Sequence, residues 1–105
     1  MDWKFFASVD EIGEGEELAK DIEGEAILLV NVGGDYYAIS NICSHMQCKL
    51  SKGSLEGFNA VCPCHNAAFN IRDGSVVRPP ASGTPIAAVE SYEVKVEDGK
   101  IFVKI

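Results

Sequence analysis

The 105-residue chain is long enough for one small domain, and its hydrophobic fraction of 47% is ordinary for a folded protein. Its net charge of −7 at pH 7 argues against nucleic-acid binding, because proteins that bind phosphate backbones present basic faces. No apolar run approaches the roughly 18 residues of a membrane span, and the first residues lack the basic start and apolar core of a secretion signal. We therefore expect a soluble cytoplasmic protein without a membrane anchor.

Alternating polar and apolar residues, rich in β-branched and aromatic side chains, predict strands through the first 42 residues. The first strand is expected at residues 4–9. An acidic, glycine-containing loop that could hold one helical turn follows at residues 10–24. Strands at 26–32 and 36–42 should form a hairpin, because Gly33-Gly34-Asp35 between them is a turn signal.

The second half of the chain continues the same pattern. Its expected strands lie at residues 58–62, 68–71, 76–77, 86–89, 92–96 and 101–105, of which 86–89 is the weakest. The last two should form a hairpin around Asp98-Gly99. No helix of ordinary length is expected. These patterns predict an all-β protein built from small antiparallel sheets.

Two cysteine–histidine pairs stand in the middle of the chain and contain both of its histidines. They are Cys43-Ser44-His45 and, after sixteen intervening residues, Cys62-Pro63-Cys64-His65. Each pair follows a predicted strand, so that two loops could present four side chains to one metal centre. The cysteines would bind as thiolates and the histidines as neutral imidazoles. Such a mixed set suits a [2Fe–2S] cluster with two sulfurs on one iron and two nitrogens on the other.

A zinc ion is the alternative occupant, because tetrahedral zinc also accepts two cysteines and two histidines. Common zinc fingers, however, place both cysteines in one pair and both histidines in the other. Here each pair is mixed. The alternative from a different functional class is a regulatory subunit that binds zinc or holds no cluster.

Three segments of the chain resemble the cluster loops of Rieske ferredoxins. Cys43-Ser44-His45 with the following Leu50-Ser51-Lys52-Gly53 resembles the first loop. Cys62-Pro63-Cys64-His65 with Phe69 resembles the second. The residues that resemble the proline-rich third loop are Gly74, Arg78, Pro79, Pro80 and Ala81. The resemblance implies that Cys43 and Cys62 bind one iron, and that His45 and His65 bind the other through Nδ1.

The resemblance also implies a single Rieske domain over residues 1–105. Its fold would be a β-sandwich, with the base at about 1–40 and 83–105 and an inserted cluster-binding subdomain at about 41–82. Four side chains would then shield the cluster: Leu50, Phe69, Pro79 and Pro80. For Leu50, simple core packing is an equal alternative to a place on a docking surface.

Cys48 and Cys64 resemble a cysteine pair of the Rieske proteins in respiratory cytochrome bc complexes, which implies a disulfide between the two loops. Two buried free thiols are the alternative. The hydroxyl donors of that respiratory group are replaced here by Ala67 and Phe69, which cannot donate, so the reduction potential should be lowered. We expect a potential between about −400 mV, as in plant-type ferredoxins, and about +300 mV, the upper end of the Rieske range.

No phosphate-binding loop, dinucleotide fingerprint or second cluster motif stands in the sequence, so no catalytic residues are predicted. The resemblance implies a soluble one-electron carrier rather than an enzyme, either a general Rieske ferredoxin of the small archaeal kind or the ferredoxin component of a multicomponent oxygenase. Its partners would be a reductase and an acceptor enzyme.

Half of the sixteen acidic residues lie between Asp10 and Glu25, where Lys20 is the only base. Such a run is most often a solvated surface. It could also be an acidic face that steers a basic redox partner. The sequence leaves both interpretations open.

Overall fold

The computed structural model describes residues 2–44, 48–64, 66–83 and 85–105, and within them it confirms the predicted all-β class. Two short 3₁₀ turns, η1 (Val9–Glu11) and η2 (Leu50–Lys52), accompany the strands. The strands are β1 (Trp3–Ser8), β2 (Glu17–Ile22), β3 (Glu25–Val32), β4 (Asp35–Ser40), β5 (Ser54–Glu56), β6 (Asn59–Val61), β7 (Ala68–Asn70), β8 (Val76–Arg78), β9 (Ser91–Tyr92), β10 (Val94–Glu97) and β11 (Lys100–Lys104). No helix of the described residues is long and apolar enough to cross a membrane.

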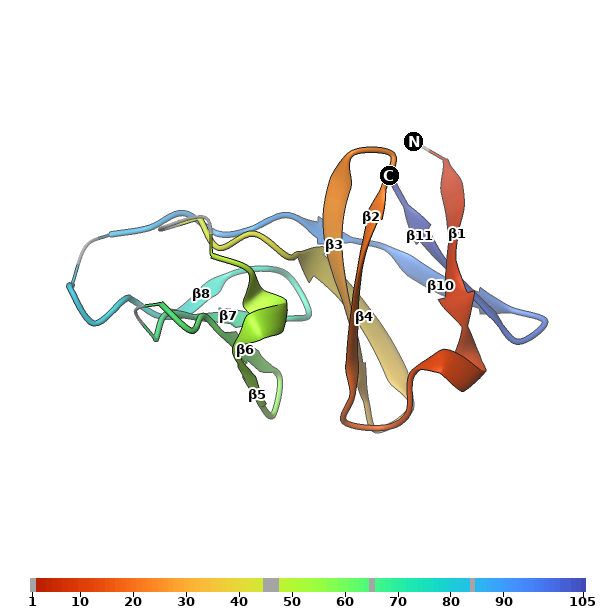
Figure 1. Cartoon of the computed structure of the whole chain (residues 1–105), viewed down its shortest axis with the longest axis horizontal. Coiled ribbons are helices and arrows are strands. Elements are labelled where there is room, and N and C mark those ends of the chain that lie inside the picture. The colour runs from red at the N-terminus through yellow and green to blue at the C-terminus, as the bar shows by residue number, and fades with distance from the viewer. Residues whose placement is uncertain (1, 45–47, 65, 84) are drawn as a thin grey trace.

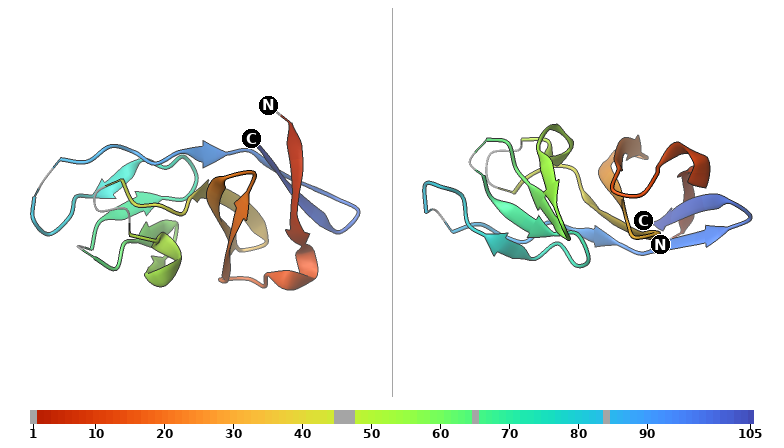
Figure 2. Two further views of the ribbon diagram at one scale, coloured as in Figure 1. Left: turned by 45° about the horizontal axis from the view of Figure 1, so that its top comes forward. Right: turned by 90° about the horizontal axis from the view of Figure 1, so that it is seen from below.

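The strands form three antiparallel sheets along an elongated molecule of 44 × 27 × 19 Å. The outer sheet has the order β1-β11-β10, and the central sheet has the order β2-β3-β4-β9. The distal sheet, β5-β6-β7-β8, lies at the opposite end of the molecule from the two chain termini (Figures 1 and 2). The termini pair with each other, since the main chains of Asp2 and Ile105 exchange two hydrogen bonds of 2.9 and 3.1 Å.

The predicted hairpin of β3 and β4 turns on Gly33 and Gly34. Both have positive φ, 62° and 92°, between the paired residues Val32 and Asp35. Two central residues with positive φ define the turn whose twist matches that of the flanking strands. Glycine adopts this conformation without the steric cost that a Cβ atom brings.

Strand β3 is buried on both faces and separates two hydrophobic cores. Ile27 and Leu29 pack into the core between the central and outer sheets. Leu28 and Val30 point the other way, into the core that the central sheet shares with the distal end of the chain. Because side chains alternate along a strand, its continuous apolar run fills both cores.

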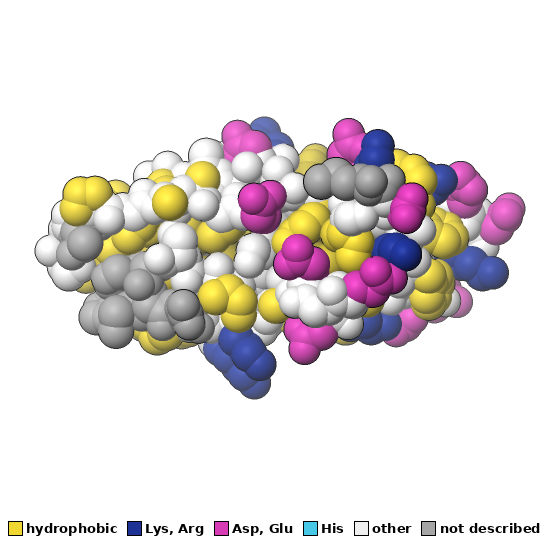
Figure 3. Space-filling model, turned by 90° about the horizontal axis from the view of Figure 1, so that it is seen from above, with side chains coloured by type: hydrophobic (Ala, Val, Ile, Leu, Met, Phe, Trp, Pro, Cys, Tyr) yellow, Lys and Arg dark blue, Asp and Glu magenta, His cyan; other side chains and the backbone are white. Residues whose placement is uncertain are grey.

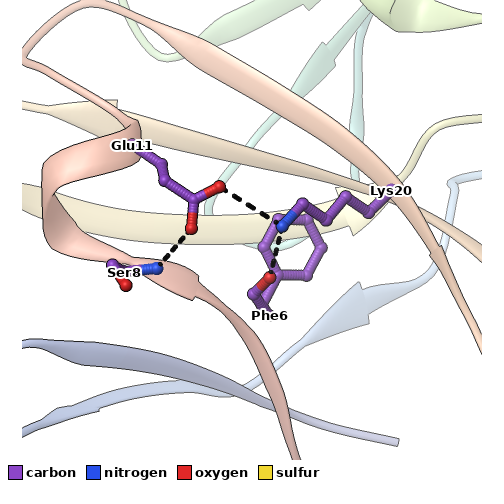
Figure 4. A network of polar contacts seen from close by, with 4 residues as sticks. All are labelled: Phe6, Ser8, Glu11 and Lys20. Carbon is purple, nitrogen blue, oxygen red and sulfur yellow. Dashed lines mark hydrogen bonds and ion pairs between the residues drawn. The ribbon is translucent and has the colours of Figure 1, made fainter.

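The prediction of a loop over residues 10–24 was wrong in its second half. Residues 17–22 form β2, which pairs with β3 from Glu17 opposite Val30 to Ile22 opposite Glu25. A polar network ties this strand to β1 (Figure 4). Nζ of Lys20 donates to the main-chain oxygen of Phe6 at 2.8 Å and lies 3.5 Å from the carboxylate of Glu11. Lys20 thus holds an acidic strand on the edge of the central sheet.

Three other expectations differ from the structure. The single strand expected at 92–96 is divided into β9, in the central sheet, and β10, in the outer sheet. Strand β5 was not predicted, although it pairs fully with β6. Residues 86–89 form no strand. The amide of Val89 instead donates to the main-chain oxygen of Gly74, between β7 and β8, at 2.9 Å. A methyl group at Gly74 would overlap the Val89 carbonyl, so glycine is required at this close approach.

Candidate metal centre

Cys43 and Cys62 begin two loops that are closed in the same way. The amide of Cys43 donates to the oxygen of Cys48 at 2.8 Å, and the amide of Cys62 donates to the oxygen of Ala67 at 2.7 Å. Each loop therefore returns on itself after five residues. The first loop leaves the end of β4, and the second connects β6 with β7.

Both cysteines are buried in the core on the distal side of the central sheet, with exposed fractions of 0% for Cys43 and 1% for Cys62. Leu50, Ala67 and Phe69 are fully buried in this same core. For Leu50 the structure therefore favours core packing over a place on a docking surface. That Leu50 and Phe69 shield a cluster remains a prediction.

A disulfide joins Cys48 of the first loop to Cys64 of the second, as the resemblance to respiratory proteins implies. The Sγ atoms of Cys48, Cys62 and Cys64 all lie within 4.8 Å of one another. Two of these sulfurs are bonded to each other, so the three do not form a separate metal site. The disulfide instead fixes the distance between the loops beside Cys62.

The end of β8 is fastened to the second loop, and the segment after β8 is fastened to the first. Nε of Arg78 donates to the main-chain oxygen of Asn66 at 2.9 Å, and Oγ of Ser44 donates to the oxygen of Ala87 at 2.5 Å. Pro80 is buried and Pro79 is exposed, so only the former is enclosed by the described residues. Whether the two prolines shield a cluster remains a prediction.

The residues that follow the first loop pack directly on the second. A methyl group on Gly53 would overlap the carbonyl oxygen of Val61 and would lie 3.1 Å from Cδ of Pro63. A hollow of about 460 Å³ opens beside this contact, between Gly53 and the residues Cys62, Cys64 and Ala81. The requirement for glycine explains the Lys52-Gly53 step in the first loop motif.

Two of the acidic groups near the loops, Glu56 and Asp73, interact with neighbouring side chains at the surface. The guanidinium of Arg78 lies 3.7 Å from the carboxylate of Glu56, and both side chains are partly exposed. In the turn between β7 and β8, hydrogen bonds from the hydroxyl and amide of Ser75 hold the pKa of Asp73 below its usual value. Glu56 is the last residue of β5, and Asp73 lies in the turn between β7 and β8.

His45 and His65 lie outside the described residues. The complete ligand set therefore stays a prediction. The described half of the donor set nevertheless fits a cluster, because two buried sulfurs open two loops that a disulfide holds together. Sequence reasoning missed the bonds of Arg78 and Ser44. They join residues 12 and 43 positions apart, and no local pattern signals them.

Comparison with known proteins shows the family of the chain. The model of the Rieske [2Fe-2S] domain matches residues 2–101. The ferredoxin component of the naphthalene 1,2-dioxygenase/salicylate 5-hydroxylase systems of Ralstonia sp is 31% identical over 105 residues, which cover 100% of this chain and 97% of that protein. The 3-phenylpropionate/cinnamic acid dioxygenase ferredoxin subunit of Escherichia coli (strain K12) is 39% identical over 98 residues, 92% of this chain and 88% of that one.

The fold is also similar to that of a solved ferredoxin, that of carbazole 1,9a-dioxygenase from Nocardioides aromaticivorans IC177. The TM-score is 0.89 at 30% identity, with coverage of 98% of this chain and 97% of the other. The chain belongs to the Rieske [2Fe–2S] family and is a ferredoxin of that family, an electron carrier that uses a [2Fe–2S] cluster.

Proposed function

We propose that the cluster is held by Cys43, His45, Cys62 and His65, and that the chain passes single electrons from a reductase to a terminal oxygenase. We further propose that it converts no substrate itself and works in the cytoplasm. We also propose that residues at about 41–82 form a cluster-binding subdomain, inserted into a base formed by about 1–40 and 83–105.

One observation carries the ligand assignment: the buried sulfurs of Cys43 and Cys62 open two loops that the Cys48–Cys64 disulfide fastens together. The histidines stand two and three residues after these cysteines, close enough for each loop to offer one sulfur and one nitrogen. The short spacing lets each loop present its own sulfur and nitrogen, and the disulfide keeps the two loops together.

The bound cluster supplies a one-electron couple, and the chain tunes that couple through charge. The Cys43 and Cys62 thiolates offset the 2+ charge of an oxidised core, and neutral His45 and His65 add none. A neutral site accepts an electron more readily than the −2 site that four thiolates would create. Burial of both cysteines also excludes water from the sulfur side of the site.

The choice of an oxygenase as electron acceptor is supported by the relatives. Those named above are ferredoxin components of dioxygenase systems. A solved complex of reduced oxygenase and oxidised ferredoxin in carbazole 1,9a-dioxygenase contains a chain that matches 96% of this one at 28% identity and a TM-score of 0.83. The extra cysteine pair departs from the pattern usual in oxygenase ferredoxins, so a general Rieske ferredoxin is the second candidate.

Reconstitution with iron and sulfide under anaerobic conditions tests the proposal. We expect a red-brown protein with two irons and two sulfides per chain, a one-electron reduction and the EPR spectrum of a reduced Rieske centre. A colourless protein that binds one zinc ion would contradict it. Electron transfer assays with purified reductase and oxygenase components would then separate the two candidate functions.

A further inference from the structure

The charges of this chain are divided unevenly between its two ends. Residues 41–82 carry four basic and two acidic side chains, a net charge of +2: Lys49, Lys52, Arg72 and Arg78 against Glu56 and Asp73. Because the whole chain carries −7, the remaining residues carry −9. On the face shown in Figure 3, acidic side chains gather over the half with the termini, and the described side chains in view at the opposite tip include none.

Two of the four bases in this segment are locally compensated. Arg78 pairs with Glu56 at 3.7 Å, and the positive charge of Arg72 helps to lower the pKa of the neighbouring Asp73. Lys49 and Lys52 are exposed, and neither makes an ion pair with any residue that the structure describes. We call these two the lysine pair, and they carry the uncompensated positive charge of this end.

The lysine pair flanks the two cysteine loops. Lys49 directly follows the disulfide-bonded Cys48 and bridges to Ile42, the residue before Cys43. Lys52 precedes Gly53, whose backbone packs on the second loop at Val61 and Pro63. A hollow of about 210 Å³ beside β2 is lined by both of these lysines and by Lys20, with Asp21 as the only acid among its lining residues.

Distance decides which charges a partner senses at this end. In 0.1 M salt the Debye length is about 10 Å, so charges about 20 Å away are strongly screened. Part of the acidic run of residues 10–25 lies close to the lysine pair, because Lys20 and Asp21 of β2 line the same hollow, where their opposite charges offset each other. A protein that approaches this hollow therefore senses the lysine pair and its immediate neighbours more strongly than acidic residues about 20 Å away.

We infer that the lysine pair marks the face by which this ferredoxin docks, and that the matching face of its redox partner is acidic. The inference rests on the proposed function and adds to it the chemistry of the partner. It treats the acidic run at 10–25 as a solvated surface and not as the docking face. Opposite potentials on the two faces would speed encounter without a large apolar contact.

Two small oxidants test the local charge. Reduced holoprotein is mixed at 0.1 M ionic strength with ferricyanide, a trianion, and separately with tris(1,10-phenanthroline)cobalt(III), a trication. Each oxidant takes one electron from one reduced cluster, and the return of visible absorbance gives the rate. We expect Lys52→Glu to slow oxidation by ferricyanide roughly fivefold, as for two charge units about 10 Å from a trianion, and to speed oxidation by the cobalt complex.

Lys100→Glu is the matched control. Lys100 is also an exposed lysine, it has no ion pair among the described residues, and its replacement changes the net charge equally, but it lies on β11 of the base. We expect less than a twofold effect on either oxidant. Equal effects of K52E and K100E would overturn the inference. Lys49→Glu provides a second variant if K52E loses its cluster.

A redox-inert anion gives a reading that does not depend on electron transfer. Hexacyanochromate(III) is paramagnetic and broadens the NMR signals of nearby residues. We expect it to broaden the amide signals of residues 49–54 more than those of 100–102, and K52E to abolish this difference. Uniform broadening would contradict the inference. Failure of the proposed function is a different result, because then no EPR signal of a Rieske centre would form in any variant.

Discussion

The side chain of Arg78 holds the main-chain oxygen of Asn66 at 2.9 Å, and so connects β8 to the residue that follows His65. Asn66 has a φ of 62°, a left-handed conformation in which a residue other than glycine carries strain. The hydrogen bond thus holds a strained residue in the second cysteine loop.

Replacing Arg78 by glutamine should loosen this loop. The lost hydrogen bond is worth about 1 kcal/mol, so we expect the cluster to be lost about fivefold faster in the presence of an iron chelator. Arg78→Lys should retain part of the effect. The control is Arg72→Gln, because Arg72 stacks on Phe58 at the other end of the distal sheet. Equal rates of cluster loss in R78Q and R72Q would show that the bond to Asn66 does not matter.

A hydroxyl restored at position 69 should raise the reduction potential. Phe69 is fully buried in the core that contains both cysteines, at the position where the respiratory group carries a donor. A hydrogen bond that favours the reduced state by about 1 kcal/mol corresponds to about 40 mV for one electron. Potentiometry of Phe69→Tyr measures this shift. Phe58→Tyr, at a residue 37% exposed, should leave the potential unchanged.

His65→Cys tests the ligand assignment directly. A thiolate in place of a neutral imidazole adds a negative charge to the site, and the potential should fall by about 100 mV or more towards that of clusters with four cysteine ligands. The cluster itself should be retained, which EPR and iron analysis can verify. A cluster with an unchanged potential would mean that His65 is not a ligand.

Removal of the disulfide should lower the stability of the protein. Cys48 and Cys64 are 16 residues apart, and a crosslink that closes a loop of this length contributes about 3 kcal/mol. Both cysteines should be replaced by serine, because a single change would leave a free thiol close to Cys62. Guanidinium unfolding of the apoprotein, followed by Trp3 fluorescence, gives the difference in free energy. A reductant should destabilise the wild type and leave the double variant unaffected.

Glu17 should make the stability depend on pH. Its Oε2 atom is buried and has no hydrogen-bond partner in the described part of the chain, and burial raises the pKa of this carboxyl group. The folded pKa is then above the unfolded one, so stability is highest below the unfolded pKa and falls as pH rises through the folded pKa.

We therefore expect Glu17→Gln to raise the melting temperature at pH 7 and to have little effect near pH 4, where the wild-type carboxyl is protonated. Glu14→Gln, at an exposed position of the same acidic run, should change the melting temperature at neither pH. A lower melting temperature for E17Q than for the wild type at pH 7 would contradict the assignment.

The elements that could be predicted from the sequence are those with local signals. The run around Leu28 and the turn at Gly33-Gly34 predict β3 and its hairpin, and the order of the cysteines and histidines predicts the family. Strand β2 could not be predicted in this way, because its acidic composition is typical of a loop and its pairing depends on β3. The fastening of Asn66 by Arg78 depends on how β8 folds back, which spacing along the chain does not encode.

Strand β3 has a consequence for how the molecule opens. Leu28 and Val30 belong to the core of the cysteines, whereas Ile27 and Leu29 belong to the core of the base. Neither core can lose its packing without freeing side chains on a strand that the other core needs. The two ends should therefore unfold as one cooperative unit, and the loss of iron at the distal end should accelerate hydrogen exchange in the base.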